Sequence, residues 1–594
     1  MKNDSGLEIV VKDGLYIHDE YTKEANKIAD YVRDKLHLSF DNVEFRLVDN
    51  DEFAESIALY TDPLPSWHTG QEFVFMHERM SSQQMHLYEM VGHTYTRKTD
   101  NKPFTLVYIN RNNSKGDVLS VIAHVYGHLH MNKNNWLCSR TKADLDVYER
   151  YRERYRKLEE KVGSDAVESM YDTAQTLTGL IDIYPDSRPK SEDSYYSTDK
   201  SVPRTTVYDI YKFVIENARL NPWEKELLDM VYNIRKNDRG ILRTKIMHEG
   251  FATFVEEKYV LNKCVEDMQK RKGIKVKLEE AEDEISKLKL AEELKSVEKD
   301  MSMGFSMENK ILKIADVLNG PQFPYAFGFR LFRDIEERWD KGRHGPRYER
   351  LSAYEKKSYD SGDIKGLEKV LEVAKHKTDW DFMFSHADTD FINGYMDTIK
   401  QSYRTMIKTL SREQLEALTH KIFGGPLDEE SEEEVIDLLS DALTENLIGT
   451  RDPNKLRLKL LLQTERSTPN LYIPKGVVSR TNSLFINQDV NFIDKYIDLN
   501  EIVDDDGDKV GGTEAERAEY LKAIKGNMLT LDNEQSHTAM KRLANLWGGE
   551  VVLRTIDNEG NRILLSTTGT EIRRLEESNK KTQSLLDKFG IDSL

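Results

Sequence analysis

Cysteine is nearly absent from this sequence, whose 594 residues include only Cys138 and Cys264. Two cysteines are too few for a disulfide framework or for a zinc site built from cysteines, so we expect a reducing compartment. Long apolar runs are also lacking, because no segment reaches the roughly 18 residues that a membrane span needs. The N-terminal residues show no cationic stretch followed by an apolar run, so we expect no signal peptide. Together these absences predict a cytoplasmic protein without a membrane span.

Basic residues are outnumbered: 86 Lys and Arg stand against 105 Asp and Glu, which gives a formal net charge of −19. Binding to nucleic acid requires clustered basic residues. The basic runs here stand next to acidic residues, so we expect no nucleic-acid partner. The phosphate-binding patterns G-x-x-x-x-G-K-[ST] and G-x-G-x-x-G are both missing. A nucleotide cofactor is therefore not expected.

Three successive regions are expected from the patterning, within a predominantly helical α+β protein. Region 1–140 combines a helix over 22–36 with three short runs between 72 and 110, EFVFM, YEMVGHTY and PFTLVYIN. These runs are rich in β-branched and aromatic residues, so they predict a small antiparallel sheet. Region 451–594 is a smaller mixed α/β region with a hairpin at 551–567, where two apolar runs flank a polar turn.

The middle region, 141–450, is expected to be helical and to contain an inserted helical hairpin at about 258–305. The hairpin segment is nearly half Lys and Glu, which is typical of solvated helices. Its apolar residues repeat as a seam for only about two heptads, whereas a coiled coil needs three or four. The seam consists of Leu278, Ala281, Ile285 and Leu288.

Histidine placement is the most informative feature of the sequence. Asp117 precedes the apolar repeat of VLSVIAHVYGHLHM, which predicts a helix with Asp117 as N-cap and one buried face. His124 and His128 are four residues apart in this run, so both rings project from one helical face at a spacing that one zinc ion needs. His130 points further round the helix, so we expect it to support the ligands or to lie at the surface.

A carboxylate from a second helix would complete such a site. The segment MHEGFATFVEE offers Glu249, and Gly250 and Ala252 beside it leave room for another helix or a metal to approach. Histidines at this spacing are often unrelated. Two features favour a joint site here: unpaired imidazoles on an apolar helix are costly, and a carboxylate helix is available.

A hydrolase would also need a proton acceptor near the metal. Zinc peptidases with the pattern H-E-x-x-H carry a Glu after the first His, but Val125 occupies that position here. Glu256, His248 and Glu89 are the candidate catalytic residues that we consider in its place. A His or Glu near a metal can instead hold the ligands by hydrogen bonds.

Five motifs, in order along the chain, resemble the stage V sporulation protein R (SpoVR) family. Departures stand out in two motifs. After His128, the residues Leu129, His130, Met131 and Asn132 stand where the family usually has a polar residue and two Phe before Lys-Asn-Asn. In the later motif, His248 and Phe251 replace the Asn and Trp of the family's Asn-Glu-Gly-Trp-Ala pattern, and Glu256 replaces a typical His. His124, His128 and Glu249 match the family. The motifs are VIAHVYGHLHMNKNNW (121–136), ENARLNPWEKELLDMV (216–231), TKIMHEGFATF (244–254), FPYAFGFRLFRDIEERWDKGRHGP (323–346) and LANLWGGEVVLRT (543–555).

The resemblance implies a role in sporulation, particularly spore cortex formation, or in stress programmes alongside a serine-kinase partner. The family's Glu-Gly pattern is similar to one in zinc metallopeptidases whose Glu binds metal, which implies a zincin-like core. Our first hypothesis is a zincin-like metalloprotein, with His124, His128 and Glu249 holding zinc or another divalent metal, that hydrolyses peptide or amide bonds. The alternative is an interaction protein in which the same cluster is a structural metal site or a polar core network.

Overall fold

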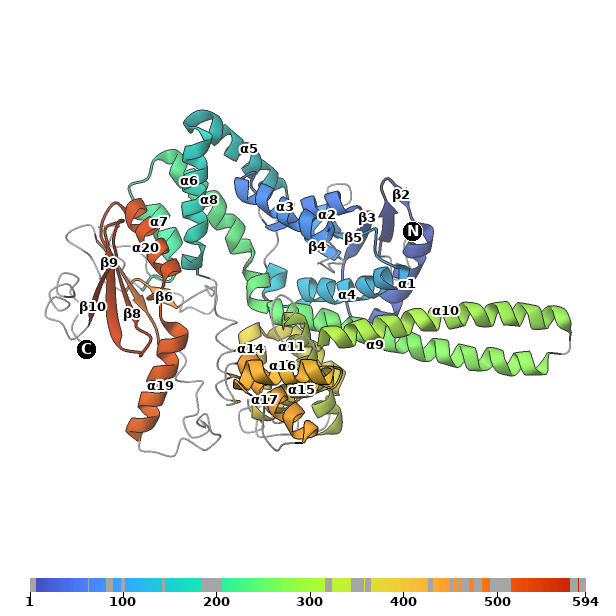
Figure 1. Cartoon of the computed structure of the whole chain (residues 1–594). Coiled ribbons are helices and arrows are strands. Elements are labelled where there is room, and N and C mark those ends of the chain that lie inside the picture. Colours follow the sequence, from blue (N-terminus) through green and yellow to red (C-terminus); the bar gives the residue numbers. More distant parts are fainter. Residues whose placement is uncertain are drawn as a thin grey trace. The chain divides into compact units, whose positions relative to one another are not determined.

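The computed structural model of the chain is an α+β structure dominated by helices (Figure 1). The residues that it describes are 7–61, 63–81, 89–97, 102–140, 145–182, 206–281, 283–315, 323–342, 357, 365–425, 431–448, 453, 456–457, 460, 470–474, 483–491, 514–576 and 586.

By internal contacts the chain divides into two compact units. Unit 1 comprises residues 1–63, 67–146 and 244–449, and unit 2 comprises 64–66, 147–243 and 450–594. Each unit collects segments that are far apart in the sequence. The expected boundaries near 140 and 450 lie close to changes of unit, but residues 141–450 are shared between the two.

Unit 1 contains a five-stranded sheet in the order β2-β1-β3-β5-β4. Strand β3 pairs in parallel with both β1 and β5, so the sheet is mixed and the expected antiparallel sheet is wrong. Antiparallel pairing is confined to the two edge strands, β2 and β4. The strands are β1 (Ile9–Asp13), β2 (Tyr16–Ile17), β3 (Asn42–Val48), β4 (Glu89–Arg97) and β5 (Lys102–Asn110).

The EFVFM run, which we expected to be a strand, lies in helix α3 (Trp67–Ser81). Phe73 and Met76 are three residues apart, so on a helix they share a face, and they pack with Phe53 and Ala54 of helix α2 (Asn50–Thr61). The run is too short for its period to separate helix from strand, and the packing against α2 decides the outcome.

Helices make up the rest of unit 1. The expected helix at 22–36 is confirmed as α1, although it begins three residues earlier. The helices are α1 (Asp19–Asp34), α4 (Lys115–Asn134), the main part of α9 (Arg239–Glu280), α10 (Glu284–Ala315), α11 (Phe323–Lys341), α13 (Gly366–His376), α14 (Asp379–His386), α15 (Thr389–Ile407), α16 (Arg412–Phe423) and α17 (Glu432–Ile448), with a short 3₁₀ turn at Cys138–Arg140.

Helices α9 and α10 form the expected hairpin, which extends from the body of unit 1 (Figure 1). The expected seam is wrong, because Ile285 and Leu288 are 68% and 64% exposed. The chain turns between α9 and α10, so residues before and after the turn belong to different helices and cannot continue one seam. Ile274 and Val297 are buried instead.

Unit 2 contains a second five-stranded sheet, in the order β10-β9-β8-β7-β6, with β7 and β8 parallel and the other pairs antiparallel. The expected hairpin at 551–567 is confirmed as β8 and β9. The elements are α5 (Leu145–Val162, from residue 147), α6 (Ser164–Thr176), a 3₁₀ turn (Thr178–Leu180), α7 (Ile210–Asn217), α8 (Pro222–Asn237), β6 (Leu471–Tyr472), β7 (Leu484–Gln488), α19 (Glu514–Leu529), α20 (Glu534–Trp547), β8 (Val551–Ile556), β9 (Arg562–Thr567) and β10 (Arg573–Glu576).

None of the helices that the structure describes combines the length and the apolar character needed to cross a membrane.

Candidate metal centre

Helix α4 carries both histidines of the candidate site, and it is buried on nearly every side. The expectation of a single buried face is wrong, because residues 118–131 are all buried. Tyr126 faces α1 and the sheet: its hydroxyl donates to Ala25 O at 2.9 Å, and its ring lies edge-on to Phe45 of β3. The N-cap is Ser114 rather than Asp117, which occupies the third helical position of a capping box.

Small residues let α9 approach both α4 and α11 closely. A β-carbon on Gly127 would lie 2.6 Å from the Cα of Ala252, and one on Gly250 would overlap the backbone of Gly328 on α11. In both cases the β-carbon would come closer to the neighbouring helix than real β-carbons do. The space that we expected Gly250 and Ala252 to provide is therefore filled by helix backbone.

A kink at Thr244 starts the part of α9 that carries the acidic residue. Thr244 has φ −131° and ψ 17°, so helical hydrogen bonding begins again after it. Asp379 of α14 accepts hydrogen bonds from the backbone N–H groups of Ile246 and Met247, each at 2.9 Å. This side chain therefore caps the new helical start, and Glu249 follows within the next turn.

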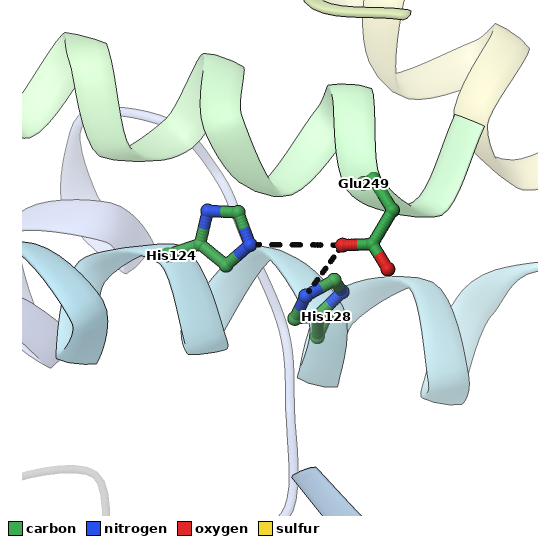
Figure 2. A group of neighbouring side chains, drawn as sticks. All are labelled: His124, His128 and Glu249. Atoms are coloured by element: carbon green, nitrogen blue, oxygen red, sulfur yellow. Dashed lines mark ion pairs between the residues drawn. The ribbon is translucent and has the colours of Figure 1, made fainter. Parts of the chain in front are cut away.

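His124, His128 and Glu249 meet between α4 and α9 (Figure 2). Glu249 Oε2 lies 3.3 Å from His128 Nε2 and 3.8 Å from His124 Nε2. One ligand atom from each residue falls within 4.8 Å of the others. Both imidazoles are buried, whereas the Glu249 side chain keeps 19% of its surface exposed.

The far side of His124 is held by a carboxylate. His124 Nδ1 lies 3.0 Å from Glu256 Oε2, and Ser120 donates a short hydrogen bond to the other oxygen of Glu256. The carboxylate can only accept, so Nδ1 carries the proton. Nε2 of His124 is then the unprotonated nitrogen, and it points toward Glu249.

The far side of His128 is held by a second imidazole. His128 Nδ1 lies 2.6 Å from His248 Nδ1, and His248 Nε2 lies 2.9 Å from Asn132 Oδ1. The amide oxygen only accepts, so His248 Nε2–H donates to it and His248 Nδ1 accepts from His128 Nδ1–H. Burial lowers the pKa of His248 to about 3, which keeps this ring neutral. Nε2 of His128 is therefore also unprotonated.

Glu249 is ionised in this setting. Burial opposes ionisation of its carboxyl group, but His128 and His124 in their protonated, charged forms outweigh that effect and hold its pKa well below the usual 4.5. When both rings are neutral, as the hydrogen bonds behind them imply, that favourable positive charge is missing. Two nitrogen lone pairs and a carboxylate oxygen thus converge on one small volume. Such an arrangement is repulsive unless a proton or a cation lies among the three atoms.

The candidate catalytic residues are placed differently from one another. Glu256 and His248 lie behind the histidines, on the side away from Glu249. Glu89 begins strand β4, where the structure describes the backbone but not the side chain, so its role stays a prediction. His130 is buried away from the cluster, where its Nδ1 accepts from the backbone N–H of Ser39 at 3.0 Å.

Two members of the cluster, Ser120 and Asn132, were missed by the sequence reasoning. With His124 and His128 they form a series at every fourth position, which places all four on one face of α4. Extending the spacing of the histidines by one turn in each direction would have found both residues.

Fold and site together define an α+β protein with a buried His/His/Glu cluster between two helices. The chain belongs to the SpoVR family, because it matches the family described as "SpoVR like protein" over residues 17–200 and 186–405. The matched residues include the whole cluster and end before the second sheet.

The chain is also similar to a protein of Escherichia coli (strain K12) named "Uncharacterized protein YcgB". The two are 23% identical over 274 residues, which is 40% of this chain and 52% of that protein. The chain therefore spans about half the length of this curated relative. No solved structure matches the chain.

Proposed function

We propose that this SpoVR-family protein binds a divalent metal, with zinc favoured, through His124, His128 and Glu249 in a zincin-like core. Ligands about 2.1 Å from a tetrahedral ion lie about 3.4 Å from one another. The 3.3 Å and 3.8 Å separations around Glu249 Oε2 are close to that value. Within the part of the chain that the structure describes, this buried oxygen accepts no hydrogen bond of good geometry. The convergence of three ligand atoms is the observation that carries the proposal.

Hydrolysis of peptide or amide bonds is the activity that this ligand set favours. Two histidines and one carboxylate form a three-ligand set that, in catalytic zinc sites, leaves the fourth position to water. A bound zinc ion would supply Lewis-acid activation of that water. The partial exposure of Glu249 is consistent with access from solvent.

Hydrolysis also needs a base that accepts a proton from the activated water. Val125 stands where H-E-x-x-H enzymes carry their base, and it is buried and apolar. Glu256 and His248 would each have to leave a histidine ligand to accept a proton from water. Glu89 is the remaining candidate among the three that the sequence offered.

The alternative function is an interaction protein in which the cluster holds a structural metal or forms a polar core network. The placement of Glu256 and His248 favours this view, because each side chain is already paired with a histidine of α4. Here the helical hairpin would dock a partner, and the family resemblance suggests a serine kinase acting in cytoplasmic sporulation or stress programmes.

Metal analysis of the purified protein tests the binding proposal. We expect about one zinc, iron or manganese ion per chain, and at least a tenfold lower content in the His124→Ala/His128→Ala variant. His130→Ala is the matched control, because this buried histidine of the same helix lies outside the cluster. Equal metal content in the double variant and the parent would refute the site.

Glu249→Gln separates the two functions once metal has been found. If the site is catalytic, this variant loses hydrolysis of casein or of peptidoglycan fragments while its melting temperature stays within a few degrees of the parent. If the site is structural, the variant unfolds at a much lower temperature and no hydrolysis depends on Glu249.

A further inference from the structure

Each histidine of the proposed metal site has its own support on the side away from Glu249. Behind His124 stands an anionic pair, Glu256 with Ser120. Behind His128 stands a neutral pair, His248 with Asn132. The two supports share no residue, so each can be altered without touching the other.

We infer that Glu256 and His248 are positioning residues, which hold His124 and His128 with Nε2 unprotonated and aimed at Glu249, and that they do not carry protons in a reaction. The inference rests on the proposed metal site. It follows from the hydrogen-bond directions. The Glu256 carboxylate can only accept, so His124 Nδ1 carries a proton. Asn132 Oδ1 can only accept from His248 Nε2–H, which leaves His248 Nδ1 to accept from His128 Nδ1–H.

The negative charge of Glu256 has a specific consequence for the metal. A carboxylate that accepts the Nδ1 proton makes the imidazole a stronger donor at Nε2, and loss of such support typically weakens metal binding by about 10- to 100-fold. Ser120 occupies the second oxygen of Glu256 and so fixes the orientation of the carboxylate. His248 accepts the His128 Nδ1–H through an uncharged nitrogen, so it holds the orientation of the His128 ring without adding negative charge.

The chain provides a matched control for Glu256. Glu257 is the next residue of α9 and is equally buried, but its carboxylate pairs with Arg333 of α11 at 3.2 Å instead of with a histidine. Glu256→Gln and Glu257→Gln therefore remove the same charge from the same helical turn. Only the first removes it from behind a proposed ligand.

His248 can be tested by two substitutions with opposite expectations. Glutamine at this position can accept from His128 Nδ1–H and donate to Asn132 Oδ1, so His248→Gln preserves the support. Leucine can do neither, so His248→Leu leaves the His128 N–H without its acceptor. A purely structural role of the buried ring would make both variants similar.

The experiment measures zinc affinity by competition with a chromogenic chelator, together with the visible absorption of the cobalt-substituted protein. We expect Glu256→Gln to bind zinc about 10- to 100-fold more weakly and to shift the cobalt spectrum, while Glu257→Gln stays within about twofold of the parent. We expect His248→Leu to lose about tenfold and His248→Gln to recover most of that loss.

The inference is overturned if Glu256→Gln matches Glu257→Gln, or if the two His248 variants bind zinc equally. A parent protein that binds no metal would instead overturn the proposed function. Melting temperatures of the metal-free variants separate folding defects from weakened binding, because positioning predicts a loss of affinity without a matching loss of stability.

Discussion

The two halves of helix α9 differ sharply in their surroundings, although one continuous helix contains both. The first half, 245–264, holds His248, Glu249 and Glu256 and is mostly buried against α4 and α11. The second half, 265–280, forms one arm of the hairpin and exposes Val265, Met268 and Val276.

This contrast shows what a ligand site requires beyond helix formation. Both halves have helical backbones, but only the first half is held from several sides by close packing and by the cap from Asp379. Ligand atoms must be placed to within a fraction of an ångström, and packing provides that accuracy. The hairpin half lacks such restraint, so substitutions there should be tolerated.

The largest expected effect comes from Gly250→Ala in the packed half. A β-carbon there overlaps the backbone of Gly328, so α9 and α11 must separate. We expect a loss of stability of about 3 kcal/mol and a reduced metal content, measured by scanning calorimetry and metal analysis. Unchanged stability would show that the two helices are not in close contact.

A smaller loss is expected for Asp379→Asn, which weakens the cap at the Thr244 kink. Asparagine keeps one accepting oxygen, so one of the N–H groups of Ile246 and Met247 loses its partner, at a cost of about 1–2 kcal/mol. Asp381→Asn, on the same helix, is the control and should change the melting temperature little. If the two variants have the same melting temperature, Asp379 does not cap α9.

The smallest effect, and of opposite sign, is expected for Gly273→Ala in the hairpin half. No atom lies within 4 Å of the added methyl group, and alanine is favoured over glycine within a helix by about 0.5–1 kcal/mol. We expect slightly higher stability and unchanged metal content. A loss of stability comparable to that of Gly250→Ala would erase the contrast between the two halves.

Local sequence patterns gave correct predictions for elements and hairpins that are formed by one continuous segment of the chain. The helix with His124 and His128 follows from periodicity, the α9–α10 hairpin from its high Lys and Glu content, and the β8–β9 hairpin from the polar turn between two apolar runs. The sequence patterns gave wrong predictions where packing or pairing with another element determined the secondary structure. The run at 72–76 is helical because it packs on α2, and the sheet is mixed because β3 pairs in parallel with β1 and β5.

The amino-acid sequence alone determined that two imidazoles share one face of a helix, because the 3.6-residue period acts within a single segment. Only the tertiary structure decided that Glu249 meets those imidazoles while Glu256 and His248 stand behind them. All three belong to α9, but the direction in which each side chain points depends on how α9 packs against α4. That packing depends on the close contact between Gly127 and Ala252. The sequence indicated that Ala252 leaves room for another helix, but only the structure shows that α4 fills it.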